Sequence, residues 1–272
     1  MTKTPKERVD VLLVERGLIE TREKAKRAIM AGTVFSNENR LEKPGEKITI
    51  DTPLQIKGNE LRYVSRGGLK LEKALSFFEV DIEGKLMIDI GASTGGFTDC
   101  ALQNGAKHCY ALDVGYNQLA WKIRQDERVT VMERTNFRYV TPADLVAGMP
   151  DFATIDVSFI SLKLILPVLK TLLVPGSSII ALVKPQFEAG KDNVGKKGVV
   201  RDPKIHLAVL EKIAHFAQEV GFTLKNASFS PITGGEGNIE FLFHLVAEQS
   251  EEPIFKYEQL KILVNQAHES LT

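Results

Sequence analysis

Five short apolar segments lie between residues 86 and 183, and each precedes a stretch with the residue spacing of an amphipathic helix. The segments span residues 86–90, 108–112, 129–133, 151–156 and 178–183. Strands that alternate with helices build a mainly parallel sheet whose two faces are covered by the helices. The alternation therefore predicts a doubly wound, Rossmann-like α/β domain.

The end of this domain has a different pattern. A helix is expected over 203–220, because Asp202 can cap it and Pro203 suits its first turn. Two extended runs follow, 222–229 and 239–246, separated by a glycine-rich connection. Without a crossover helix, such strands can pair only in antiparallel fashion. A parallel sheet that ends in an antiparallel hairpin is the class I methyltransferase form of the doubly wound fold.

The first sixty or so residues predict a separate small α+β unit, feasible when docked on a larger neighbour. Two short helical patterns occupy residues 8–31 and are interrupted at Gly17 and Gly32, with Thr21 as the expected N-cap of the second. Strand-forming residues follow at 33–35 and 47–50.

Charge is balanced over the whole chain, with 35 Lys and Arg against 35 Asp and Glu, but it is not evenly distributed. Residues 1–80 contain 16 basic and 12 acidic residues, and Arg22, Lys24, Lys26 and Arg27 form the densest basic cluster. Cys100 and Cys109 lie in or beside apolar runs, as expected for reduced thiols. Because the chain has neither an apolar run of ~20 residues nor a signal-peptide core, we expect a cytoplasmic protein.

A glycine turn follows the first strand of the large domain. Residues 86–90 lead directly into Gly91-Ala-Ser-Thr-Gly-Gly96 and then into a helical stretch. Small residues let a backbone approach a ligand, and the helix N-terminus offers free N–H donors. Asp113 ends the next strand, 18 residues after Gly95, where its carboxylate can accept ribose hydroxyls. The combination favours a nucleotide-like ligand over a purely structural turn.

The glycine spacing separates two cofactor classes. Ser93 stands where a dinucleotide-binding turn has its middle glycine, which lets the backbone approach a pyrophosphate. S-adenosylmethionine has no phosphate, so the turn and the terminal hairpin favour this cofactor over a nicotinamide dinucleotide. Asn136, after the third strand, could recognise the adenine edge or cap a turn. The candidate cofactor contacts are Asp89, Gly91, Ser93, Thr94, Gly95, Gly96, Phe97, Asp113, Val114, Asn136 and Asp156.

Seven motifs resemble those of TlyA-type proteins: SRGGLK at 65–70, DIGASTGGFT at 89–98, LDVGY at 112–116, ERTN at 133–136, DVSFIS at 156–161, VKPQFE at 183–188 and GNIE at 237–240. The resemblance implies a ribosomal RNA cytidine 2′-O-methyltransferase, of a family historically labelled hemolysins, acting on ribosomal RNA or ribosomal subunits. It also implies an S4 RNA-binding domain over 1–60 and an FtsJ-like catalytic domain over 61–247. The remaining residues, 248–272, have the pattern of an amphipathic tail.

The resemblance assigns a catalytic Lys-Asp-Lys-Glu tetrad to Lys70, Asp156, Lys184 and Glu240. Asp156 and Lys184 end consecutive strands, at the sheet edge where open α/β folds bind ligands. We hypothesise that Lys184 positions and deprotonates a ribose 2′-hydroxyl. Lys70 would lower the pKa of Lys184, and the two carboxylates would oppose this. The alternative is that both lysines are ordinary solvated surface charges.

The resemblance also places phosphate contacts in the S4 module, where the loop 36–39 departs from the family's usual Val-Asn-Gly pattern. A glycine-bounded loop, residues 190–198, contains three lysines and is either RNA-facing and mobile or merely solvated. The candidate RNA contacts are Arg8, Arg22, Lys24, Lys26, Arg27, Arg66, Lys191, Lys196 and Lys197. The Cys and His spacing matches no metal site.

Two alternatives remain from other functional classes. A non-catalytic ribosome-assembly factor could keep this fold, although retention of the tetrad and the glycine turn argues against it. A membrane-active hemolysin is not supported by any spanning segment, although the tail over 251–272 is amphipathic. Its possible docking contacts are Ile254, Leu260, Ile262 and Leu263.

Overall fold

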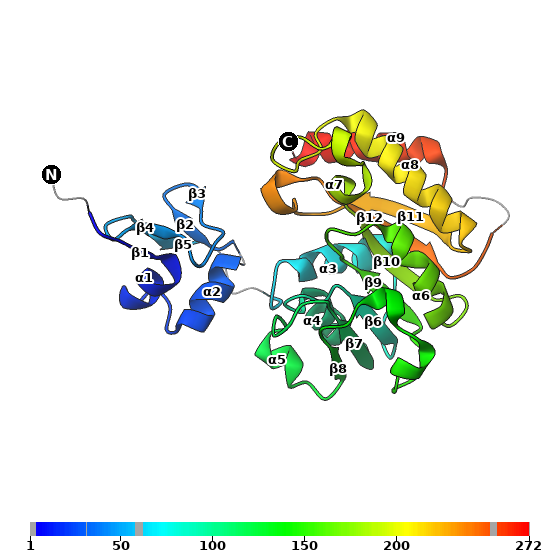
Figure 1. Ribbon diagram of the computed structural model, residues 1–272, viewed down its shortest axis with the longest axis horizontal. Helices are drawn as coiled ribbons and strands as arrows, with labels where there is room; N and C mark the ends of the chain where they lie inside the picture. Colours follow the sequence, from blue (N-terminus) through cyan, green and yellow to red (C-terminus); the bar gives the residue numbers. More distant parts are fainter. Residues whose placement is uncertain (1–3, 31, 58–61, 251–254, 272) are drawn as a thin grey trace. The chain divides into compact units, whose positions relative to one another are not determined.

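Two compact units divide the chain, Met1–Gly67 and Gly68–Thr272 (Figure 1). The computed structural model describes residues 4–30, 32–57, 62–250 and 255–271. The division lies a few residues beyond the boundary expected after residue 60. The C-terminal tail is part of the second unit.

The first unit combines two helices with short strands, as its sequence predicts. Thr21 caps the second helix, because its Oγ accepts a hydrogen bond from the Lys24 N–H at 3.2 Å. A small core of Val9, Leu12, Leu13, Ala25 and Ile29 joins the helices. The elements are α1 (Val9–Glu15), α2 (Arg22–Met30), the antiparallel pair β1 (Lys6–Arg8) and β4 (Lys47–Thr49), and a sheet of β3 (Asn39–Arg40), β2 (Val34–Ser36) and β5 (Gln55–Ile56).

The unusual loop at 36–39 forms a tight hairpin. Ser36 pairs with Asn39 across it, and Asn37 has a φ of 55°. Asparagine tolerates this left-handed conformation better than most residues, so the loop closes without the family's glycine.

A seven-stranded sheet forms the centre of the second unit, in the order β11-β12-β10-β9-β6-β7-β8. Strands β10, β9, β6, β7 and β8 are parallel, and β12 runs antiparallel to both β10 and β11. The predicted class I methyltransferase sheet is therefore confirmed. The strands are β6 (Leu86–Ile90), β7 (His108–Leu112), β8 (Val129–Met132), β9 (Phe152–Ile155), β10 (Ser178–Val183), β11 (Thr223–Phe229) and β12 (Phe241–Val246).

The helices deviate from strict alternation in two places. After β8 the chain forms only the 3-10 turns η1 (Phe137–Tyr139) and η2 (Pro142–Asp144), because an Asn136 cap and Pro142 break this short connection into single turns. After β10 there is only one helical turn before a loop. The helices are α3 (Gly67–Phe78), α4 (Gly96–Gln103), α5 (Trp121–Arg124), α6 (Leu166–Leu172), α7 (Pro185–Glu188), α8 (Pro203–Glu219) and α9 (Tyr257–Leu271).

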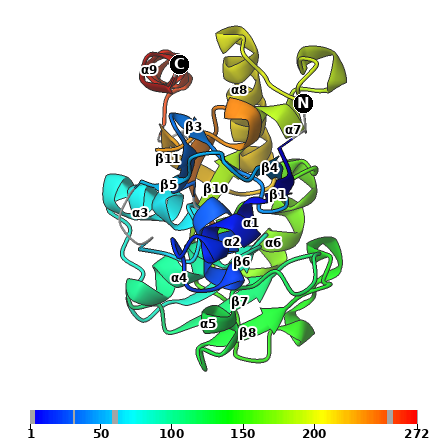
Figure 2. The ribbon, with the colours of Figure 1, turned by 90° about the vertical axis from the view of Figure 1, so that its left-hand side faces the viewer.

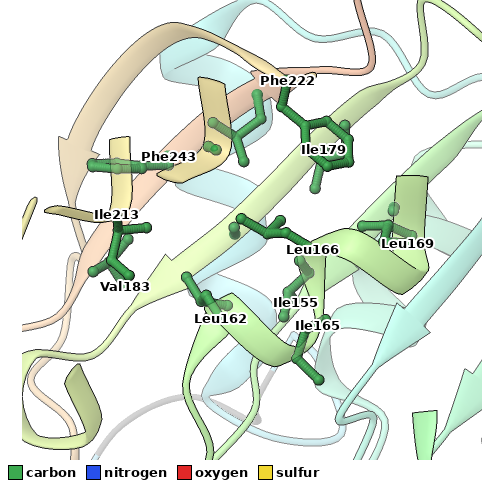
Figure 3. Packing of buried hydrophobic residues seen from close by; sticks show 14 of the residues in the cluster. Ile155, Leu162, Ile165, Leu166, Leu169, Ile179, Val183, Ile213, Phe222 and Phe243 are labelled. Atoms are coloured by element: carbon green, nitrogen blue, oxygen red, sulfur yellow. The ribbon is translucent and has the colours of Figure 1, made fainter. Parts of the chain in front are cut away.

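One continuous apolar core lies between the sheet and the helices α6, α8 and α9. Figure 3 shows part of this core, with side chains contributed by β9, β10, β12, α6 and α8. Because the parallel strands at the centre are buried on both faces, their carboxyl ends are fixed in register, and the loops that follow them converge at one edge of the sheet.

The tail helix α9 packs against α8 and β11. Figure 2 shows α9 end-on. Leu260 and Leu263 are buried in the core, as predicted. The prediction for Ile262 is wrong: its side chain is 58% exposed, because it lies on the opposite face of the helix from Leu260. Ile254 lies outside the described residues. The apolar stripe of α9 is therefore covered by the protein's own core.

We expect Leu260→Ala to lower the free energy of unfolding by about 2–5 kcal/mol, because it creates a cavity under α9. Ile262→Ala on the exposed face is the matched control and should change stability by less than about 0.5 kcal/mol. Denaturant unfolding of the full chain measures both. Equal effects would mean that α9 does not dock as described.

Candidate active site

The glycine turn between β6 and α4 is shaped mainly by contacts within the protein. Gly91 has a φ of +89°, and a Cβ built there would lie 2.5 Å from the carbonyl oxygen of Asp156. Gly95 has a φ of +94°, and its Cβ would lie 2.9 Å from Leu119. Both glycines are required by backbone conformation and packing. These contacts add a packing requirement to the expectation that small residues let the backbone approach a ligand here.

Ser93 occupies the position of the missing middle glycine, and it adopts the left-handed conformation that glycine would favour, with a φ of 49°. Its backbone N–H donates a hydrogen bond of 2.8 Å to Asp113 Oδ2. This bond holds the strained residue and ties the turn to the end of β7. The Ser93 side chain is exposed, Thr94 is partly buried, and Gly96 and Phe97 are buried at the start of α4.

Asp89 supports the turn from the protein interior. It is fully buried, and its two carboxylate oxygens accept hydrogen bonds from the hydroxyls of Thr98 at 2.7 Å and Thr154 at 2.8 Å. Burial raises the pKa of Asp89 to about 6, against the lowering effect of these two bonds. Because its oxygens face the protein interior, we revise the role of Asp89 from cofactor contact to support of the turn.

Asp113 lies at the carboxyl end of β7. Its Oδ1 accepts the N–H of Gly115 at 2.7 Å, in addition to the Ser93 bond on Oδ2. Each carboxylate oxygen can accept a further hydrogen bond, so Asp113 can still receive two hydroxyls. Val114 beside it is 71% exposed. Asn136 instead caps the turn η1 by accepting the Arg138 N–H at 3.2 Å, which is the structural alternative considered for it.

The four tetrad side chains come together from four separate segments at this edge of the sheet. Asp156 follows β9, Lys184 follows β10, Glu240 precedes β12 and Lys70 lies on α3. The Nζ of Lys184 lies 2.5 Å from Asp156 Oδ1, and the Nζ of Lys70 lies 3.6 Å from Asp156 Oδ2 and 2.6 Å from Glu240 Oε2. The contacts form a chain of alternating charge, Lys184, Asp156, Lys70, Glu240.

Both lysines are only 8% exposed, so they are not solvated surface charges. Burial alone would lower the pKa of Lys70, but the charges of Asp156 and Glu240 outweigh burial and raise it. Burial alone would raise the pKa of Asp156, but Lys70 and Lys184 lower it below the usual range. The carboxylates of Asp156 and Glu240 thus stabilise the charged form of Lys70.

Two loop residues next to the tetrad were not assigned a role from the sequence. Ser158 Oγ accepts a hydrogen bond of 3.2 Å from the Lys184 Nζ, which fixes the direction of the lysine. Phe159 is 90% exposed with a φ of 62°, an unusual conformation for a bulky residue. Its ring lies 4.9 Å from the ring of Phe187, measured between centroids. An aromatic pair, with Phe159 exposed and Phe187 half-buried, therefore lies on the loops that follow Asp156 and Lys184.

The loops after β9 and β10 are joined by Glu188. This carboxylate is 4% exposed and accepts hydrogen bonds from Ser161 Oγ at 2.6 Å and from the Leu162 N–H at 2.7 Å. Burial raises its pKa despite these bonds. Because Asp156 and Lys184 lie on the two joined loops, Glu188 helps to keep them in register.

Two basic residues of the first unit, Arg8 and Arg22, contact a buried carboxylate. Asp10 is fully buried and accepts hydrogen bonds from Arg8 at 2.8 and 3.0 Å and from Arg22 at 3.1 Å. The bond from Arg8 is the largest cause that lowers the pKa of Asp10, to about 2. Arg8 and Arg22 therefore have a structural role that the sequence did not reveal.

Other predicted RNA contacts are less constrained. Lys24 pairs with the exposed Glu20 at 2.5 Å. Within the described residues, Lys26 and Arg27 form no ion pair. Arg66 is half-buried. In the second unit, Lys191, Lys196 and Lys197 are exposed along residues 190–198, which we call the lysine loop.

In the described part of the chain, no group of three or more His, Cys, Asp or Glu side chains is placed to hold a metal ion. In the same residues, no helix is both long and apolar enough to span a bilayer.

A sequence model of FtsJ-like methyltransferases matches residues 63–247, and a model of the S4 domain matches residues 7–52. The chain belongs to the FtsJ-like methyltransferase family. The matched range includes the glycine turn and all four tetrad residues, so the site described above lies within the family's catalytic domain.

Individual relatives confirm the resemblance to TlyA-type proteins. The Bacillus subtilis protein YqxC, named as a candidate rRNA methyltransferase, is 70% identical over 98% of this chain and 95% of its own. The 16S/23S rRNA (cytidine-2′-O)-methyltransferase TlyA of Mycobacterium tuberculosis is 43% identical over 88% and 89% of the two chains. A solved structure described as a candidate hemolysin, from Streptococcus thermophilus, superposes with a TM-score of 0.77 at 57% identity, covering 98% and 97% of the two chains.

Gly91→Ala should lower the free energy of unfolding by about 2–4 kcal/mol, because alanine is strained at positive φ and its Cβ meets the Asp156 carbonyl. A Cβ at Gly235 meets nothing within 4 Å, so Gly235→Ala is the control and should change stability by less than about 0.5 kcal/mol. Denaturant unfolding compares the two. A neutral Gly91→Ala variant would contradict the packing described for the turn.

Proposed function

We propose that the protein is an S-adenosylmethionine-dependent methyltransferase that modifies a ribose 2′-hydroxyl of ribosomal RNA, with cytidine as the target nucleoside. The observation that carries the proposal is the buried chain of alternating charges at the carboxyl edge of the sheet, next to the turn between β6 and α4. Such an arrangement can hold the oxygen that receives a methyl group beside the methyl donor.

The residues around the turn suit adenosylmethionine. Asp113 retains hydrogen-bonding capacity for two ribose hydroxyls, and the exposed Val114 offers an apolar surface beside it. Ser93 makes the turn without the glycine that a pyrophosphate would favour. The cofactor supplies an electrophilic methyl group on a sulfonium. The carboxylate of Asp156, at the adjoining strand end, favours a cation in this place.

The tetrad suits the methyl acceptor, the ribose 2′-hydroxyl. Lys184 Nζ, oriented by Asp156 and Ser158, would hold the 2′-oxygen in line with the methyl group. In its neutral form the amine would take the hydroxyl proton as the O–C bond forms and the C–S bond of the sulfonium breaks. Lys70 and Glu240 fix Asp156 from the other side. On this proposal most of the rate enhancement comes from alignment of the reacting atoms, which needs no strong base.

The surroundings of the tetrad support an RNA acceptor. The Phe159 ring is exposed beside Lys184's partner Ser158, where an unstacked base could lie against it. The S4 domain and the lysine loop add exposed cations for phosphate. Ribosomal RNA and cytidine are inferred from the activity in the name of the Mycobacterium tuberculosis relative.

The direct test incubates the protein with labelled adenosylmethionine and separated ribosomal subunits, and then maps the methylated nucleotide. In single-turnover reactions, Lys184→Ala should be slower by about 10²–10⁴-fold, since it loses the group that orients the hydroxyl and takes its proton. Glu240→Ala should also be impaired, because Lys70 loses its closest partner.

The matched control is Lys107→Ala, an exposed lysine just before β7 at the opposite edge of the sheet. This variant should react like the wild type. Near wild-type methylation by Lys184→Ala would refute the role assigned to the tetrad. A wild-type product methylated on a base would refute the ribose assignment.

RNA binding by the S4 domain is tested at Lys26 and Arg27. Arg22 is less suitable, because a glutamate there would face the buried Asp10. The double variant Lys26→Glu, Arg27→Glu should weaken RNA binding and reduce the salt slope by roughly one for each phosphate that the variant no longer neutralises, with adenosylmethionine affinity unchanged. Filter binding across a salt series measures this effect.

Reversal of two exposed lysines outside the S4 domain, Lys107→Glu with Lys261→Glu, controls for net charge. If this control lowers the salt slope as much as the S4 variant does, the effect is one of overall charge and the S4 assignment is wrong.

A further inference from the structure

Asn238 lies in the glycine-rich segment between β11 and β12, two residues before Glu240. It is 4% exposed. Its Oδ1 accepts the Val200 N–H at 3.1 Å, and its Nδ2 donates to the carbonyl oxygens of Gly198 at 2.9 Å and Gly235 at 3.1 Å. One buried amide therefore joins the end of the lysine loop to the segment that contains Glu240.

The segment around Asn238 is tightly connected to the tetrad. The Gly234 N–H donates to the Asn238 carbonyl oxygen at 2.8 Å, and the Ser230 N–H donates to the Glu240 carbonyl oxygen at 2.8 Å. A Cβ at Gly234 would collide with Glu240 Oε1, so the loop packs directly on this carboxylate. A shift of Asn238 would consequently displace Glu240.

The carbonyl group of Val200 is held as well as its N–H. Its carbonyl oxygen lies 3.1 Å from Nε2 of the buried His206 on α8, so this nitrogen must carry the proton. In neutral His206, Nδ1 is then the acceptor, and His268 Nε2 on α9 donates to it at 2.9 Å. Both backbone polar groups of Val200 are thus fixed, one to the helices and one to Asn238.

The lysines precede this fixed point directly. Lys196 and Lys197 are exposed and lie in a turn closed by the bonds from the Gly198 N–H to the Gly195 carbonyl at 2.8 Å and from the Gly195 N–H to the Val199 carbonyl at 3.0 Å. Because Asn238 holds the carbonyl of Gly198, it determines where this turn lies relative to β12.

We propose that Asn238 is a positioning residue that holds the lysine loop at a fixed distance from the catalytic tetrad. An RNA phosphate bound by Lys196 and Lys197 would then place the target ribose against Lys184 and Glu240. The proposal rests on the proposed RNA methylation. Loss of the Asn238 side chain should therefore impair the use of RNA and leave the binding of adenosylmethionine intact. A general loss of stability would not produce this combination.

The test compares Asn238→Ala with Asn226→Ala, whose side chain accepts only the neighbouring Ala227 N–H at 2.8 Å among the bonds described. In Asn238→Ala, kcat/KM for ribosomal RNA should fall by about ten- to a hundredfold, with adenosylmethionine affinity unchanged. Trypsin should cut the folded variant faster after Lys196 and Lys197. The Asn226→Ala control should resemble the wild type in each measurement.

A double-mutant cycle separates positioning from simple destabilisation. Lys196→Ala with Lys197→Ala should lower kcat/KM for RNA, and the addition of Asn238→Ala should cause little further loss, because the residue acts through the lysines. Fully additive losses, or unchanged trypsin cleavage in Asn238→Ala, would overturn the proposal.

Two outcomes distinguish this proposal from the proposed function. If the lysine variant methylates RNA normally, the RNA role of the loop is wrong, whatever Asn238 does to trypsin cleavage. If the lysine variant is impaired and Asn238→Ala is not, only the positioning role is wrong. Should Asn238→Ala fail to fold, hydrogen exchange in the wild type still tests the positioning role. Rapid exchange of the Val200 amide would show that Asn238 does not hold this residue in place.

Discussion

The charge chain Lys184, Asp156, Lys70, Glu240 is the interaction on which the rest of the site depends. Each of its members is largely withdrawn from water, and a buried charge is tolerated only when it is paired. Removal of one partner from such a set typically costs ~3–5 kcal/mol, because the remaining charge is left uncompensated. The four segments that supply these side chains must therefore meet in one arrangement.

The second unit provides that arrangement through its sheet. Parallel pairing aligns the ends of β9 and β10, and the antiparallel strand β12 brings Glu240 beside them. The loops are then fixed by buried polar side chains. Glu188 joins the loops after β9 and β10, and Asn238 joins the lysine loop to the start of β12. Reactive side chains are thus held by hydrogen bonds between loops as well as by strands.

Much of the fold was predictable because it depends on local patterns. Apolar segments of five or six residues located β6 to β10 to within about one residue at each end, and the Asp202-Pro203 pair located the start of α8. The regions after β8 and β10 were predicted less well, since single turns leave no helical periodicity. Ile262 was placed on the wrong face of α9 because its neighbours Leu260 and Leu263 also fit an apolar stripe.

The candidate site was predictable where a motif implies a chemical role. Lys70, Asp156, Lys184 and Glu240 were assigned by resemblance, and the structure brings them together. No linear pattern indicated that Asp10 pairs with Arg8 and Arg22, or that Asp89 bonds two threonines. Ser158, Phe159 and Asn238 were present in recognised motifs, but their partners lie on other segments, so their spacing along the chain could not assign them a task.

Sequence alone determined the order of strands and helices, the place of the glycine turn and the identity of the four charged residues, because local backbone preferences and short motifs specify these. Tertiary structure alone decided what each residue faces. The glycines at 91 and 95 proved to pack against neighbouring protein atoms, Asp156 and Glu240 proved to raise the pKa of Lys70, and Asn238 proved to bridge two loops. These outcomes depend on contacts between distant segments and on the burial of charge, which exist only after the chain has folded.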